Sequence, residues 1–231
     1  MAQNARPTSV SLEDYAYQEL RKMIHQGVFK PGEQLLQVEL AAQLGISRTP
    51  LRRALANLEH ERLIEFSPRG EAFVTRFDTK EIADIFEVRA VLEALSCRLA
   101  VNTVERKHTA YLRSLLTAAM EEISPEDQSA YRQADIEFHT YIATLAPNPF
   151  LQQLLDSYQI MSLSFAQGLL RAPTETFDEH MRILDALDQG DADLAEKEML
   201  EHIRTTITSM RHKADAVSAD TPTAGVERRR I

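Results

Sequence analysis

Three histidines and one aspartate in the second half of the chain have the residue types and the spacing of metal ligands. Asp135 and His139 are four residues apart, so both side chains would lie on one face of a helix. His180 and His202 each fall on the apolar stripe of a helical pattern, ten residues before and twelve residues after Gly190. If these two helices pair antiparallel, the offsets are about 15 Å and 18 Å along their axes, so the imidazoles would face each other. Three imidazole nitrogens and one carboxylate oxygen are donors that divalent transition metals bind.

A polar core is the alternative interpretation of the same residues. A single histidine on an apolar stripe is more often a hydrogen-bonded core residue than a ligand, and an Asp/His pair at this spacing can be only a hydrogen bond. The remaining histidines of this half, His108 and His212, have no comparable setting and are interpreted as surface residues. The spacing alone therefore leaves a metal site and a polar core both open.

Arg89 is the next residue whose position suggests chemistry. It shares a helical stripe with Ile82, Ile85 and Phe86, which predicts that its guanidinium points into the protein. A buried cation needs an anionic partner, because leaving it unpaired is strongly unfavourable. A structural ion pair with Glu93 or with another acid would satisfy it.

A cluster of arginines and hydroxyl side chains in the first half suits contacts with nucleic acid. Ser47, Arg48 and Thr49 are followed by Arg52 and Arg53. Arginine can hold guanine O6 and N7 with two hydrogen bonds, and short hydroxyl side chains can reach phosphates or bases. Arg48 and Arg52 are four residues apart and would share one helix face. The alternative is that these residues form an exposed, polar start of a helix that only keeps the surface soluble.

The elements that would position this cluster form a helix-turn-helix with a wing. Two short helical patterns, over residues 37–44 and 49–60, are joined by a tight turn at Gly45, and in this motif the second helix enters the major groove. Two β-prone runs around a Pro/Gly turn then predict a hairpin, with Arg69 and Gly70 at its tip. Another helix is predicted over residues 11–26.

After residue 77 the pattern becomes entirely helical, with breaks at proline or glycine. Six helical patterns are predicted, approximately over residues 79–102, 105–122, 125–146, 150–170, 174–189 and 191–213. The predicted fold class is therefore mainly α. A winged helix-turn-helix with a small β-hairpin (11–77) is followed by an antiparallel all-helical bundle of about six helices (78–213). Residues 1–10 are predicted to be a flexible arm and residues 214–231 a disordered tail.

The charge distribution agrees with this division. The net charge of −9 argues against nucleic acid as a partner, but residues 1–78 hold 10 Lys/Arg and 10 Asp/Glu, so the remainder carries the whole −9. Residues 47–76 hold six arginines against four glutamates. The basic excess thus lies on the predicted DNA-contacting motif.

Composition also bears on the compartment. The chain has one cysteine, which excludes an intramolecular disulfide and fits a reducing compartment. No apolar run approaches the roughly 20 residues of a bilayer-spanning helix, and the N-terminus lacks the apolar stretch of a secretory signal. We expect a cytoplasmic protein with no membrane partner.

The first half resembles the winged domain of GntR-family bacterial transcription regulators. The resemblance rests on a Ser-Arg-Thr-Pro-x-Arg core and on flanking positions: Pro31-Gly32, Leu35, Leu40-Ala41, Leu44 to Arg52, Ala54-Leu55, Leu58, Leu63-Ile64, Arg69-Gly70 and Phe73-Val74. It implies that Arg48 and Arg52 contact bases, that Ser47 and Thr49 touch backbone or bases, and that Gly70 marks the wing tip. The family usually has an acidic residue where this chain has Arg53, which would add a phosphate contact or alter operator preference.

The second half resembles the FCD ligand-binding domain of the FadR subfamily. The matching motifs are Glu87-x-Arg89-x-x-Leu92-Glu93, Asp135-x-x-Phe138-His139, Asn148-x-Phe150-Leu151, Glu179-His180-x-x-Ile183 and Met199-x-x-His202-Ile203. The resemblance implies one divalent transition metal per subunit on the Asp/His/His/His set, with zinc preferred to nickel or manganese. It also implies that Arg89 clamps the carboxylate of a small effector.

The resulting hypothesis is a homodimeric transcription regulator, expected to be a repressor and not an enzyme. Its affinity for pseudo-palindromic, double-stranded operator DNA would be controlled by a small carboxylate bound at the metal. Two alternatives stay open at this point. One is a metal-dependent enzyme fused to a DNA-binding domain, because an open coordination position could activate water. The other is a direct sensor of the metal.

Overall fold

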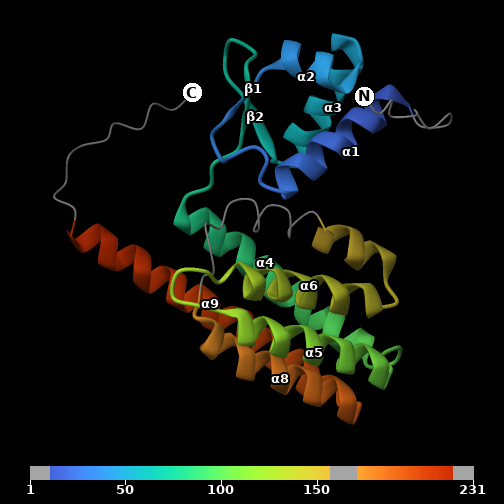
Figure 1. Ribbon diagram of the computed structural model, residues 1–231, viewed down its shortest axis with the longest axis vertical. Coiled ribbons are helices and arrows are strands. Elements are labelled where there is room, and N and C mark those ends of the chain that lie inside the picture. The colour runs from blue at the N-terminus through green and yellow to red at the C-terminus, as the bar shows by residue number, and fades with distance from the viewer. Residues whose placement is uncertain (1–10, 157–170, 221–231) are drawn as a thin grey trace. The chain divides into compact units, whose positions relative to one another are not determined.

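The computed structural model describes residues 11–156 and 171–220 (Figure 1). The chain divides into two compact units, with the boundary between Arg76 and Phe77. The arm predicted over residues 1–10 and residues 221–231 of the predicted tail lie outside the described residues. Along the described helices, none is both long and apolar enough to cross a membrane.

The first unit is built on three helices, α1 (Leu12–His25), α2 (Gln37–Leu44) and α3 (Arg48–His60). Ser11 caps α1 by accepting a hydrogen bond from the Asp14 backbone amide at 3.0 Å. Gly45 ends α2 with φ of 65°, a left-handed conformation that glycine adopts readily, and this allows the tight turn into α3. The facing surfaces of α1 and α3 bury Leu20, Ile24, Leu51, Leu55 and Leu58 completely.

A three-stranded antiparallel sheet completes this unit, in the order β1-β3-β2. The predicted hairpin is confirmed as β2 (Ile64–Phe66) and β3 (Ala72–Val74), paired in the register Ile64↔Val74. The sequence did not predict β1 (Gln34–Leu35), which pairs with β3. A strand of two residues is too short to show an alternating pattern.

The second unit is a bundle of long helices: α4 (Thr79–Ala100), α5 (Arg106–Glu122), α6 (Ser129–Leu145), α8 (Pro173–Gln189) and α9 (Ala192–Asp220). Helix α4 packs along α9, α9 also packs on α8, and α5 packs on α6 and α8 (Figure 1). Residues 149–156 are helical and begin the pattern predicted over 150–170, of which residues 157–170 lie outside the described part. The last helix is longer than predicted, because its backbone continues beyond Lys213 to Asp220, into the segment predicted as a tail.

Local signals explain where these helices begin and end. Asp78 and Glu81 form a reciprocal capping box at the start of α4, with bonds of 2.9 Å and 2.8 Å. Gly190 adopts φ of 71° and ends α8, so that α9 can start two residues later and return antiparallel. The buried face of α4 includes several small residues, such as Ala90 and Ala94, in one cluster with Ile207 of α9. Small and large side chains thus fill the space between the helices.

Candidate metal centre and nucleic-acid interface

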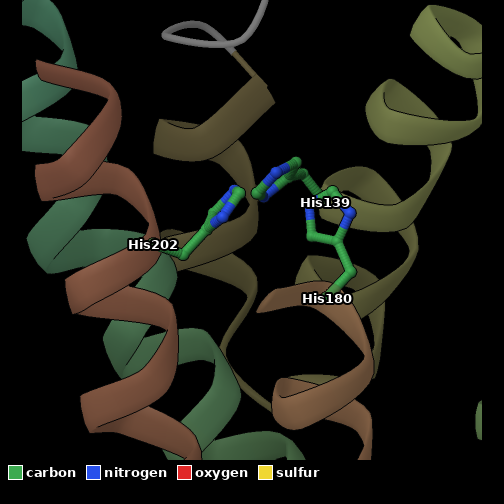
Figure 2. Close-up of side chains that lie close together, drawn as sticks. All are labelled: His139, His180 and His202. Carbon is green, nitrogen blue, oxygen red and sulfur yellow. The ribbon is translucent and has the colours of Figure 1, made fainter. Parts of the chain in front are cut away.

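Three buried imidazoles from three different helices converge in the second unit. His139 comes from α6, His180 from α8 and His202 from α9, and Figure 2 shows their rings turned toward one another. The candidate ligand atoms all lie within 4.8 Å of one another. Ring centroids are 5.5 Å apart for His139 and His180, 5.2 Å for His139 and His202, and 4.6 Å for His180 and His202. The α8–α9 hairpin about Gly190 brings the last two rings to the same level, as their offsets predicted.

Two glutamates, of which Glu93 is buried and Glu179 is partly buried, hold the Nδ1 atoms of two of these rings. His139 Nδ1 lies 2.5 Å from Glu93 Oε2, and His202 Nδ1 lies 2.7 Å from Glu179 Oε2. A carboxylate accepts the Nδ1–H of a neutral imidazole, which leaves Nε2 as the lone-pair nitrogen that can bind a metal. Both rings are therefore fixed in orientation and in tautomer.

His180 supplies the observation most specific for a ligand. Its Nδ1 lies 3.3 Å from the hydroxyl of Tyr131, which in turn is 3.1 Å from Thr176 Oγ1. No described residue hydrogen-bonds to its fully buried Nε2. The nearest charged group is Asp135, whose Oδ1 is 3.5 Å from that nitrogen. An unpaired buried polar atom is unfavourable by about 1–3 kcal/mol, and a metal bound to Nε2 would remove this penalty.

Three of the four predicted ligands, the imidazoles, converge, and the fourth, Asp135, lies next to His180. The three imidazoles are buried, whereas the Asp135 side chain retains 25% of its exposure. Three nitrogens and one oxygen fit zinc or a similar first-row divalent ion.

The electrostatics of the site favour the neutral forms of His180 and His202 and the ionised forms of Glu93 and Glu179. Burial, together with the neighbouring imidazoles, holds the pKa of His180 well below its usual range. Burial also lowers the pKa of His202, and the hydrogen bond to Glu179 only partly opposes this. Burial raises the pKa of Glu93, but Arg89 and His139 outweigh it and bring the pKa to about 2. Neutral imidazole is the form that binds a metal.

Two buried arginines neutralise these glutamates. Arg89 points inward, as predicted, and donates a hydrogen bond from Nε to Glu93 Oε1 at 2.7 Å, while its Nη2 forms an ion pair with the same oxygen at 2.6 Å. The structural ion pair that the sequence left open is therefore present. The sequence did not single out Arg171, whose Nη1 and Nη2 bind Glu179 at 2.6 Å and 2.8 Å. The hydrogen bonds from His202 and Arg171 outweigh burial and bring the pKa of Glu179 to about 2.

In the first unit, four of the seven predicted DNA-contacting residues line one groove between α3 and the wing. Arg48 and Arg52 from α3 and Arg69 and Gly70 from the wing border a cavity of about 660 Å³. Gln37, at the start of α2, donates a hydrogen bond to the Gly70 carbonyl at 3.0 Å and ties the wing to the helix-turn-helix. The sequence did not predict this link, because it joins residues far apart in the chain.

The other predicted contacts lie at the start of α3. Ser47 and Thr49 are exposed on either side of Arg48. Arg53 does not border the groove: its Nη1 lies 3.6 Å from Glu13 Oε2 of α1, and its side chain keeps 70% of its exposure. The groove thus presents three guanidinium groups, with chemistry suited to phosphates and guanine edges.

Comparisons with known proteins agree with both halves of the chain. Residues 84–205 match the FCD domain, and residues 12–74 match the bacterial regulatory proteins of the gntR family. The chain is 28% identical over 213 residues to the HTH-type transcriptional regulator YdhC of Bacillus subtilis (strain 168), covering 90% of this chain and 93% of that protein. It is also 28% identical over 213 residues to the galactonate operon transcriptional repressor of Escherichia coli (strain K12), covering 81% and 91%.

Among solved structures, E. coli McbR/YncC has the same fold, with a TM-score of 0.71 at 23% identity over 89% of this chain and 99% of that one. The family matches cover both the helix-turn-helix with its wing and most of the helical bundle. The chain therefore belongs to the GntR family of bacterial transcription regulators, in the FadR-type branch that carries an FCD domain.

Proposed function

We propose that this DNA-binding regulator is a homodimeric repressor whose operator affinity is set by a small carboxylate bound at a divalent metal. One observation carries the proposal: three buried imidazoles converge beside Asp135, and Nε2 of His180 has no hydrogen-bond partner among the described residues. A core histidine with an ordinary structural role would have both nitrogens satisfied.

The charge of the site supports an anionic effector. Three neutral imidazoles and the carboxylate of Asp135 leave a bound divalent ion with one net positive charge. The two glutamates behind the imidazoles add nothing to this charge, because Arg89 and Arg171 neutralise them. Zinc is the favoured ion, with nickel or manganese as alternatives, and all three can accept a carboxylate oxygen at a further coordination position.

The groove of the first unit supports recognition of double-stranded DNA. Arg48 and Arg52 would meet base edges in the major groove, while Arg69 and Gly70 of the wing would approach the backbone. In a two-fold dimer, two such units match a pseudo-palindromic operator. Repression is supported by a relative that is named as a repressor.

The test is operator binding by the full chain, with DNA from the intergenic region upstream of its own gene. Anisotropy titrations would compare zinc-loaded and chelator-treated protein, each with a panel of small carboxylates. We expect one carboxylate to weaken DNA binding by the zinc-loaded protein only, by about 5- to 150-fold, the usual range of such coupling. A response to zinc without any carboxylate would instead favour a direct metal sensor. If neither zinc nor any carboxylate changes the affinity, the proposed control is wrong.

A further inference from the structure

Two similar series of side-chain contacts, each running from an arginine through a glutamate to a histidine, end at the proposed metal site. In the first, Arg89 and Glu93 of α4 lead to His139 of α6. In the second, Arg171, just before α8, and Glu179 of α8 lead to His202 of α9. In both, the arginine side chain is only 7% exposed, and the bond from the glutamate to the imidazole is made at Nδ1.

The hydrogen bonds of the two arginines described above go to the glutamates and not to the imidazoles. The arginines therefore act on the imidazoles through the glutamates. Arg171 donates from Nη1 and Nη2 to the two oxygens of Glu179 at 2.6 Å and 2.8 Å. Arg89 donates from Nε to Oε1 of Glu93 at 2.7 Å, with its Nη2 at 2.6 Å from the same oxygen. A guanidinium that donates twice holds a carboxylate in one plane, whereas an ammonium group is only a point charge. The carboxylate, once held, fixes the ring orientation and the position of the Nδ1 proton, and it makes Nε2 a stronger donor to a metal.

We infer that Arg171 and Arg89 are positioning residues for the metal site, acting through Glu179 and Glu93. The inference rests on the proposed function, because it requires that the imidazoles bind a metal. It differs from the effector-clamp role expected for Arg89, because both guanidinium groups are already committed to glutamates. Arg171 is the more informative of the two, since no sequence motif assigned it a role.

The alternative is that these arginines only hold helices together. Arg113 offers a matched control for that role. It bridges α5 to α8 by pairing with Asp185 at 2.6 Å and Asp188 at 3.0 Å, and it takes no part in the bonds to the imidazoles. An Arg113→Met variant therefore removes an ion pair to α8, the helix that also carries Glu179, and leaves the Arg–Glu–His contacts in place.

The experiment measures the zinc dissociation constant of the full chain by competition with a chromophoric chelator. We expect Arg171→Met and Arg89→Met each to weaken zinc binding by about 10- to 100-fold, the usual effect of removing a partner behind a ligand. Arg171→Lys should restore part of the affinity, because it returns the charge without the two-pronged geometry. Arg113→Met should bind zinc like the wild type.

A second variant tests whether misfolding explains a loss of zinc affinity. In Arg171→Met/Glu179→Gln both charges of the buried pair are removed together, so no uncompensated charge remains in the core. Its zinc affinity should still fall, and nitrogen NMR of the imidazoles should show His202 in a mixture of tautomers instead of one. Wild-type zinc affinity and an unchanged His202 tautomer in this folded variant would overturn the inference while leaving the metal site intact. If the wild-type chain binds neither zinc nor nickel nor manganese, the proposed function and this inference both fail.

Discussion

Removing the metal should destabilise the second unit selectively. A ligand that binds only the folded state adds RT ln(1 + [L]/Kd), about 2.7 kcal/mol when free zinc is at 100 times its Kd. The ligands lie on α6, α8 and α9, so the stabilisation acts on the bundle, whose compact unit spans residues 77–228. For a unit of this size, each 1 kcal/mol shifts the melting temperature by roughly 2–4 °C, so zinc should raise it by about 5–11 °C.

Calorimetry of the full chain is the suitable assay, because the two units can unfold in separate transitions. Chelator-treated protein would be scanned with and without added zinc. The transition of the bundle should move, whereas that of the winged unit should not. A His180→Gln variant should lose the zinc-dependent shift, and His212→Gln, at an exposed histidine on α9, should keep it.

Two results would refute this reasoning. One is equal melting temperatures with and without zinc, which would leave the three imidazoles as a polar core. The other is a full shift in His180→Gln, which would place the bound zinc elsewhere in the chain.

Four further predictions concern both units. Arg52→Ala should weaken operator binding by about 5- to 150-fold in anisotropy titrations, because a bidentate base contact contributes about 1–3 kcal/mol. Arg53→Ala should have a smaller effect that is equal for operator and unrelated DNA, because its side chain turns to α1 and away from the groove. Gly45→Ala should lower the stability of the winged unit by about 1–2 kcal/mol in urea unfolding, because alanine is strained at φ of 65°. Metal-free protein should lose stability as the pH falls from about 6.5 toward 4.5. The folded-state pKa values of His180 and His202 are lowered, so the unfolded chain binds more protons in that window. Each histidine can lower the free energy of unfolding by at most about 1.4 kcal/mol per pH unit. Urea unfolding at a series of pH values without zinc would measure this loss.

The sequence predicted the ligands of the candidate site better than their supports, for a physical reason. Helical spacing places Asp135 and His139 on one face, and the glycine hairpin relates His180 to His202 through chain connectivity alone. The partners at Nδ1 depend instead on how each helix is rotated against its neighbour, which no local pattern encodes. Tyr131 thus escaped notice although it is completely buried and borders His180.

The same limit applies to Arg171 and to Arg89. Arg171 lies before the first residue of α8, outside any apolar stripe, so no periodicity predicts that its side chain is buried. Arg89 lies on a stripe, and its inward direction was predicted, but spacing could not decide between an acidic neighbour and a bound anion. The ion pair between Arg89 and Glu93 depends on tertiary structure as well as on helical spacing, because His139 of another helix orients the carboxylate.

The supporting carboxylates also bear on the hypothesis of a metal-dependent enzyme. Where attack by metal-bound water uses a general base, that base is most efficient when its pKa lies near the operating pH. Glu93 and Glu179 are the carboxylates hydrogen-bonded to the imidazoles, and each has a pKa of about 2 because a guanidinium and an imidazole bind it. Both are therefore poor proton acceptors at neutral pH, and Asp135 would be occupied as a ligand. Among the described residues, the glutamates that hydrogen-bond to the imidazoles thus lack the basicity that general-base hydrolysis requires, which favours the proposed sensor over a hydrolytic enzyme.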